Sequence, residues 1–405
     1  MPKAPQMTVL NKTKQIYLFF FIAALLSACK HSKNDVDVSN IPVTVKIQRF
    51  DKDFEEMRTK PMAQQAAYLQ HKYGAFYGNV ISMMLEDAGT NIKDTAYFAR
   101  LRQVFAGKPY NDLEHDVDSV YTNLDKPQGE LTEAFKHIKY YFPQKQLPAV
   151  YAFFSGFAVQ VPVGDGYVGI GLDLFLGGNS RFYPSLTEAF PHYLSRNFNV
   201  QNICPRVVEG IAREDMFAES DSDKTMLQRM IYEGKIMYFM DKILPETPDT
   251  LKIGYTGAQL KWCQEFQSKM WAYFLDQGLL YETDNIKMQK YLGEAPFTPG
   301  IGEKNESAPK LAVWTGWQIV RAYMDKHPEV SLQQLMADND AQKILNESKY
   351  RPKDDTQSNK PGPFIFRTFP TYCNILKTPL NPIATPVIKM MLATTSANLK
   401  SAKRR

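Results

Sequence analysis

The sequence has few of the residues from which disulfide frameworks and metal centres are built. Its four cysteines are Cys29, Cys204, Cys263 and Cys373, and their spacing matches neither a disulfide framework nor a zinc knuckle. Cys204 and Cys263 could form at most one disulfide, and we expect them instead to be ordinary buried cysteines. None of the six histidines lies four positions from another, so the zinc-binding sequence His-Glu-x-x-His is absent.

A strong charge of either sign is also missing from the central part of the chain. The formal net charge is +5, but residues 1–28 contribute +3 and residues 351–405 contribute +8, which leaves −6 for residues 29–350. A mildly acidic folded part argues against nucleic acid as a partner. Because 44% of the residues are hydrophobic, this part can bury a substantial core.

The sequence has no apolar run long enough to span a membrane, but a shorter one stands near the N-terminus. Lys3, Lys12 and Lys14 precede the apolar residues 16–26. This run is about half of the roughly 20 residues that cross a bilayer. A charged stretch followed by a short apolar run is typical of a secretory signal peptide.

The signal ends in Leu26-Ser27-Ala28-Cys29, which matches a bacterial lipobox. In such a sequence the cysteine thiol is lipidated and becomes the new N-terminus. We therefore expect a signal peptide at residues 1–28, acyl chains on Cys29 and a polar tether over 29–41. The chain would be anchored to a membrane by lipid and face the periplasm. The alternative is a cleaved signal with an incidental cysteine.

Residues 42–350 are expected to form one mainly helical α+β domain with a small mixed or antiparallel sheet. Strands are predicted over residues 43–47, 149–154 and 167–176, where β-branched and aromatic residues alternate or cluster between turn signals. Helical spacing predicts, among others, helices over 187–197, 205–217 and 224–243, and Ser331 is a good cap for a later helix. Residues 351–405 are predicted to be a basic, poorly ordered tail.

A strand followed by two helices around residues 167–217 invites comparison with zinc peptidases of the gluzincin kind. In those enzymes two histidines one helical turn apart and a glutamate on the next helix hold the metal. Here His192 would be the second histidine, Glu188 stands for the first, and Ala189 replaces the general base. Glu209 falls where the third ligand would be expected. Without the base, ordinary hydrolysis is not expected.

We therefore assign no catalytic residue and no metal ligand, and expect no cofactor, zinc included. Asp173, Glu188, His192 and Glu209 are candidates for a vestigial groove that binds rather than cuts. The plainer alternative for the last two is an interior histidine with satisfied hydrogen bonds and a carboxylate on a helix surface. Pro191 would distort the helix unless it falls in the first turn.

The remaining polar groups give weaker signals. Gly164-Asp165-Gly166 is a turn sequence without the helix-opening context of a phosphate-binding loop. Glu233, Lys235 and Tyr238 share one predicted helix, and we expect surface pairing there.

Several segments, in a consistent order, resemble the gliding-motility lipoprotein family GldB of Bacteroidetes. Besides the lipobox, the segments that carry the resemblance are residues 35–40, 46–51, 170–173, 234–239 with Leu244-Pro245, 314–320 and 348–353. The resemblance implies a cell-envelope lipoprotein of gliding motility or of a related envelope process. The family is also similar to a predicted zinc-peptidase group that shares its Glu-Gly-x-Ala and Gly-Lys-x-x-Tyr elements.

Two hypotheses about function follow. The first is a non-catalytic envelope component that binds a protein or peptide partner, with an exposed strand edge beside residues 167–176 accepting an extended peptide. The alternative is a metal-dependent peptidase with substituted ligands. A tightly bound zinc ion that is lost with His192→Ala would favour the second.

Overall fold

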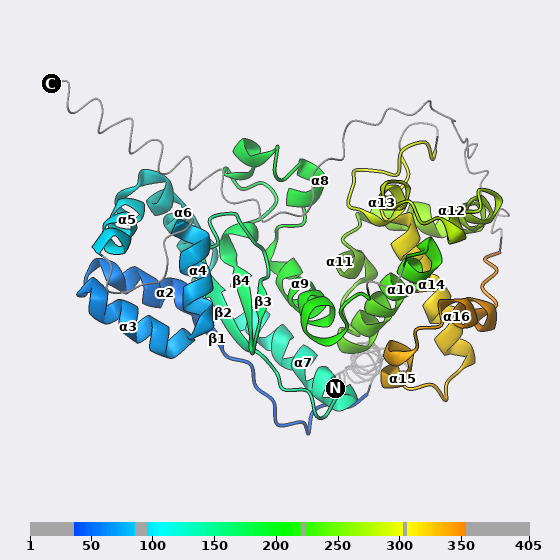
Figure 1. The fold of residues 1–405 in the computed structure, drawn as a ribbon, viewed down its shortest axis with the longest axis horizontal. Coiled ribbons are helices and arrows are strands. Elements are labelled where there is room, and N and C mark those ends of the chain that lie inside the picture. The colour runs from blue at the N-terminus through cyan, green and yellow to red at the C-terminus, as the bar shows by residue number, and fades with distance from the viewer. Residues whose placement is uncertain (1–35, 86–94, 221–223, 303–305, 354–405) are drawn as a thin grey trace, which may run out of the picture. The chain divides into compact units, whose positions relative to one another are not determined.

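The computed structural model describes residues 36–85, 95–220, 224–302 and 306–353. The chain divides into two compact units, Met1–Asn40 and Ile41–Arg405, and the described part of the second is drawn in colour in Figure 1. The predicted signal peptide, Cys29 and the tail from residue 354 lie outside the described residues. Among the described helices, none is long and apolar enough to cross a membrane.

The sheet is small and mixed, and its strands have the order β1-β2-β4-β3. The first three in that order are parallel, and β3 runs antiparallel to β4. The strands are β1 (Ile47–Arg49), β2 (Ala149–Phe153), β3 (Val163–Gly164) and β4 (Tyr167–Gly171). Parallel neighbours need a long crossover, and the described residues between β1 and β2 contain six α-helices, α2 to α7. This confirms the predicted mainly helical α+β class.

Helices cover both faces of the sheet, with α2 to α6 on one side and α7 and α9 on the other (Figure 1). The α-helices are α2 (Phe50–Glu55), α3 (Met62–Tyr73), α4 (Ala75–Leu85), α5 (Thr95–Ala106), α6 (Lys108–Val120), α7 (Asp125–Tyr141), α8 (His192–Ser195), α9 (Ile203–Gly210), α10 (Met226–Ile243), α11 (Asp249–Ile253), α12 (Gly257–Asp276), α13 (Asn285–Leu292), α14 (Leu311–Lys326), α15 (Leu332–Ala337) and α16 (Ala341–Ser348). A π-helix, Ile211–Met216, continues directly from α9.

Two predicted strands have different bounds in the structure. The first begins at Ile47, not Val43, because the N–H of Val45 donates to Thr132 Oγ1 (3.0 Å) instead of to a neighbouring strand. The strand predicted over residues 167–176 ends at Gly171 and turns into the 3₁₀ helix Leu172–Leu174. Asp173 therefore does not sit on a strand face.

The outer side of β1 and the side of β4 away from β2 both have hydrogen-bond partners. Along β1, the N–H of Ile47 donates to Gln128 Oε1 of α7 (3.1 Å). Along β4, the N–H groups of Gly169 and Gly171 donate to the carbonyls of Pro162 (2.8 Å) and Gln160 (2.9 Å). The expected exposed edge beside residues 167–176 is therefore wrong, because the chain before β3 already occupies it. An added peptide strand would find no free N–H groups there.

Helix α10 agrees closely with the helix predicted over residues 224–243. Thr225 and Gln228 form a capping box at its start, and the helix ends at Ile243, before Pro245. The predicted cap at Ser331 is confirmed, since its hydroxyl accepts from the N–H of Gln334 at the start of α15. Such local signals depend on neighbouring residues alone, which is why the sequence predicts them well.

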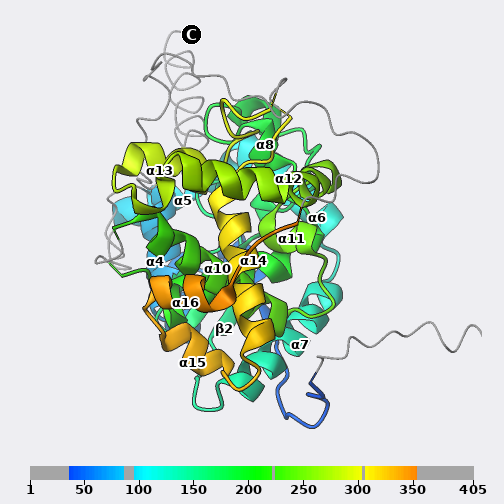
Figure 2. The same ribbon diagram turned by 90° about the vertical axis from the view of Figure 1, so that its right-hand side faces the viewer.

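The most extensive helix–helix contact of the described residues is that of α10 with α14, which lie side by side in Figure 2. Glycines let the two backbones touch. A Cβ atom on Gly316 would overlap the carbonyl of Met230, and one on Gly234 would overlap the carbonyl of Gly316. Both glycines belong to segments that carry the family resemblance. Their role here is close helix packing.

Cys204 and Cys263 are buried and free, as predicted. Burial raises the pKa of both thiols well above the usual range. A protonated thiol in apolar surroundings packs as a small hydrophobic side chain and reacts slowly. These two residues therefore belong to the core.

Candidate functional site

The helix expected to carry the candidate ligands is broken in the structure. Residues 187–197 do not form one helix; only the short α8 (His192–Ser195) lies within them. Pro191 precedes it in an extended conformation (φ −52°, ψ 153°), which separates Glu188 from the helix that His192 begins. The two side chains therefore do not share a helix face, and both are exposed. The prediction of an interior histidine is wrong for His192.

Glu209 sits near the end of α9 between two arginines. Its carboxylate pairs with Arg206 Nη1 at 2.6 Å and Arg213 Nε at 3.0 Å, and all three side chains are mostly buried. Burial by itself raises the pKa of Glu209, but the charges of Arg206, Arg213 and Lys310 outweigh it and hold the pKa at about 2. Glu209 is thus not the surface carboxylate that the plainer alternative expected.

Arg213 extends this cluster across to α10. Its guanidinium makes two hydrogen bonds to Glu233, at 3.0 Å and 2.6 Å. Arg206 donates in addition to the carbonyls of Leu251 (3.1 Å) and Lys252 (2.5 Å) near the end of α11. Charged side chains paired in this way satisfy each other's hydrogen-bonding groups inside the protein. We call Arg206, Glu209, Arg213 and Glu233 the α9 charge network.

The positive charges around Glu209 oppose metal binding at this position. A divalent cation would have to displace two arginines from the carboxylate and would lie near Lys310 as well. Within the described residues, no group of three or more His, Cys, Asp or Glu side chains is placed to hold a metal ion. The ion pairs and hydrogen bonds of the α9 charge network link α9 and the π-helix to α10 and α11.

Asp173 is fully buried and organises a tight turn. Its carboxylate accepts hydrogen bonds from the N–H (2.8 Å) and hydroxyl (2.8 Å) of Ser155 and from the N–H of Phe157 (2.5 Å). Burial raises the pKa of Asp173, and these donors oppose that effect. Gly156 (φ 66°) and Phe157 (φ 61°) are both left-handed, which is costly for a bulky residue such as phenylalanine. The carboxylate thus stabilises a strained turn.

We expect Ser155→Ala to lower the free energy of unfolding by about 1–2 kcal/mol. The variant loses the hydroxyl's bond to the buried Asp173 carboxylate and the bond that the hydroxyl accepts from the N–H of Ala158. Urea unfolding followed by circular dichroism measures the change. Ser185→Ala, which removes an exposed hydroxyl, serves as the control and should change stability by less than about 0.5 kcal/mol.

The four candidates do not form one groove lining. Asp173 is buried, Glu209 is held in the α9 charge network, and Glu188 and His192 are exposed. Sequence reasoning missed Arg206 and Arg213, although their positions three before and four after Glu209 indicate ion pairs along one helix. The pairing of Arg213 with Glu233 has no such local signal. Surface pairing of Glu233 with Lys235 and Tyr238 is wrong, because the buried Lys235 donates instead to the carbonyls of Met336 and Asp338.

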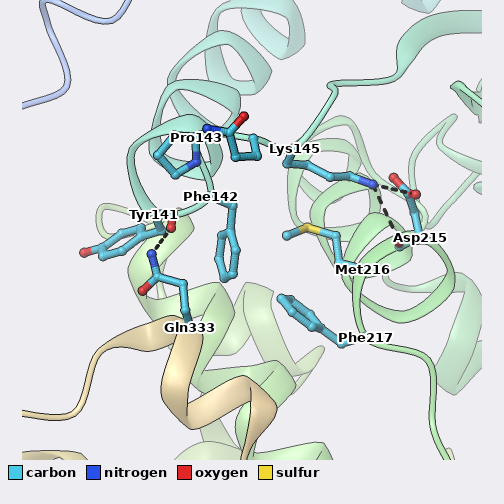
Figure 3. Close-up of a pocket in the computed structure, with 9 residues that line it drawn as sticks. Tyr141, Phe142, Pro143, Lys145, Asp215, Met216, Phe217 and Gln333 are labelled. Carbon is cyan, nitrogen blue, oxygen red and sulfur yellow. Dashed lines mark hydrogen bonds and ion pairs between the residues drawn. The ribbon is translucent and has the colours of Figure 1, made fainter.

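The π-helix also borders a hollow, which Figure 3 shows in close-up. The hollow measures about 400 Å³ and lies between the end of α7, the end of the π-helix and α15. Phe142, Met216 and Phe217 provide apolar walls, and Lys145 pairs with Asp215 at 2.6 Å across its rim. Gln333 of α15 donates to the carbonyl of Tyr141. Single-turn π-helical segments are frequent at functional sites, so this hollow is a candidate contact surface.

The fold and these contacts define a mainly helical α+β protein in which internal ion pairs hold Glu209. Comparison with protein families then identifies the group. The family model described as gliding motility protein GldB matches residues 31–352, and the chain belongs to this family. Membership implies a lipoprotein of gliding motility that is associated with the membrane. Searches of curated proteins and of solved structures found no match.

Proposed function

We propose that this protein is a non-catalytic cell-envelope component of gliding motility or of a related envelope process. In this proposal Cys29 carries acyl chains, the domain faces the periplasm, and the protein acts by binding a protein or peptide partner. The family membership supports the process, and the lipobox supports the anchor.

The observation that carries the non-catalytic part is the α9 charge network. Glu209 would be needed as a ligand in a peptidase-like centre, but Arg206 and Arg213 hold its carboxylate at 2.6 Å and 3.0 Å. Removing these pairings to seat a metal would leave buried charges without partners. Glu188 and His192, by contrast, are exposed and free to meet another protein. We propose this α8 surface as the region where a partner makes contact.

The first test concerns chemistry. We expect the purified mature chain to contain well under one zinc ion per molecule by elemental analysis, and His192→Ala to leave that content unchanged. One tightly held zinc per chain, lost with His192→Ala, would overturn the non-catalytic proposal in favour of a peptidase with substituted ligands.

The second test concerns the anchor and the contact surface in cells that glide. Cys29→Ser should release the protein from the membrane fraction and abolish gliding. Glu188→Gln combined with His192→Ala changes exposed groups alone, so folding should be unaffected, while gliding should fall several-fold. The matched control is Glu265→Gln with Lys261→Ala, an exposed pair on α12. Normal gliding by the α8 double variant would exclude this surface.

A further inference from the structure

We propose that the C-terminal end of α7 inserts into the headgroup region of the membrane that carries the lipid anchor. We call this surface the α7 tip and define it as residues 139–144. The proposal rests on the lipidation of Cys29 in the proposed function. It adds which face of the domain meets the lipid and by what kind of contact.

The first argument is the place at which the chain joins the domain. Ile47 is hydrogen-bonded to Gln128 and Val45 to Thr132, so the chain before β1 runs antiparallel to α7. From Ile47 to Val45 the extended chain covers about 7 Å, and from Gln128 to Thr132 the helix covers about 6 Å. The chain and the helix therefore run alongside each other over this stretch. Going toward the N-terminus from Val45 therefore leads toward the α7 tip. Figure 1 shows the blue chain before β1 following α7 in this way.

The second argument is the length of chain between the anchor and the domain. If Cys29 is lipidated, residues 30–40 separate it from the start of the second unit at Ile41. Eleven residues span at most about 40 Å when fully extended. This reach keeps the part of the domain around Ile41 within about 40 Å of the bilayer, and from Val45 toward Ile41 the chain leads toward the α7 tip.

The third argument is what the tip exposes. Tyr140 is 46% exposed, and its ring packs edge-on against Tyr141 at 5.0 Å between centroids. Pro143 and Gln144 are exposed beside them, and the apolar hollow with Phe142 and Met216 opens at the same place (Figure 3). Tyrosine has an apolar body and a polar hydroxyl, and it is enriched where membrane meets water.

The charges around the tip decide the kind of membrane contact. Lys136 pairs with Glu133 at 2.7 Å, and Lys145 pairs with Asp215 at 2.6 Å. Lys139 donates to the carbonyl of Pro143 (3.1 Å). Because two of these three lysines are paired with carboxylates, attraction to anionic lipid contributes little, and the aromatic side chains carry the contact. We therefore expect insertion into zwitterionic and anionic bilayers alike.

The test uses the lipidated full-length mature chain in liposomes. A fluorophore is attached at Gln144→Cys in a Cys373→Ser background, and a second sample carries it at Lys261→Cys on α12, whose side chain is 75% exposed. We expect nitroxide-labelled lipids to quench the label at 144 at least twofold more than the label at 261, in zwitterionic and in mixed anionic liposomes. Tyr140→Ser should remove at least half of that quenching.

Tyr281→Ser is the matched control, because Tyr281 is also an exposed tyrosine (67%) but lies on a different element, the 3₁₀ helix Leu279–Tyr281. It should leave quenching at 144 unchanged. Equal quenching at 144 and 261 would overturn the proposal, as would quenching that appears only with anionic lipid. Protection of residue 144 in native membranes but not in pure lipid would also overturn it and assign the hollow to a protein partner. Mass spectrometry shows whether Cys29 is lipidated. An unlipidated Cys29 would contradict the proposed function itself, whereas the outcomes above, obtained with a lipidated Cys29, would contradict only the proposed membrane contact.

Discussion

Gly316→Ala is expected to lower the free energy of unfolding by about 3 kcal/mol. The added methyl group would overlap the carbonyl of Met230, a backbone atom that cannot move aside as a flexible side chain can. Helices α10 and α14 would have to separate, and the buried residues between them, among them Trp317, would lose contacts. Chemical denaturation of the variant and the parent measures the difference.

The matched control is the same substitution on another helix. Gly129 lies within α7, and a Cβ atom there would meet nothing within 4 Å. Gly129→Ala should therefore stabilise the protein, by up to about 1 kcal/mol, because alanine has the higher helix propensity. If Gly316→Ala proved as harmless as Gly129→Ala, the close contact of α10 with α14 would be refuted.

Arg213→Met is expected to lower the free energy of unfolding at pH 7 by about 3–5 kcal/mol. Methionine keeps much of the length of the side chain but leaves the mostly buried Glu233 without its two hydrogen bonds and Glu209 with one arginine fewer. Uncompensated buried carboxylates are costly. The measurement is again the unfolding free energy, taken from pH 7 down to pH 2.

The pH dependence distinguishes this loss from simple loss of packing. The folded protein holds the pKa of Glu209 at about 2, below its ordinary value of 4.5, so the stabilisation is complete above about pH 4.5 and is lost as the pH falls toward 2. A lowering of this size corresponds to about 3 kcal/mol. The difference between Arg213→Met and the parent should therefore shrink below pH 4.5.

Glu265→Gln is the control for this prediction. Glu265 pairs with Lys261 on the exposed face of α12, where both side chains are about half exposed or more. Such pairs contribute little, so the variant should stay within about 0.5 kcal/mol of the parent at every pH. A constant difference between Arg213→Met and the parent over the whole range would contradict the assigned role of Glu209.

Helix termini with local signals were predictable. The bounds of α10 follow from Thr225, Gln228 and Pro245, which act within a few residues of the helix ends. The α8 region was harder, because Pro191 can either open a helix or interrupt one, whereas the spacing of apolar residues predicted one helix over 187–197. The structure shows that it opens a short helix at His192.

The candidate site depended most on contacts between distant parts of the chain. Arg213 and Glu233 are 20 residues apart, and the edge of β4 is covered by residues whose pairing depends on a turn at Gly164-Asp165-Gly166. Neither contact leaves a periodic trace in the sequence. Whether a carboxylate faces water, a metal or an arginine is decided by which helices pack together, so Glu209 could not be assigned from its neighbours alone.

The sequence by itself determined the lipobox at Cys29 as a prediction, the family resemblance and the mainly helical α+β class, because all three depend on residue order or on short-range periodicity. The tertiary structure decided that Gly316 is a packing residue, that Glu209 belongs to an internal charge network, and that the sheet has no free edge along β4. The physical reason is that burial and partner choice are properties of packed surfaces, which form only when segments far apart in the chain meet.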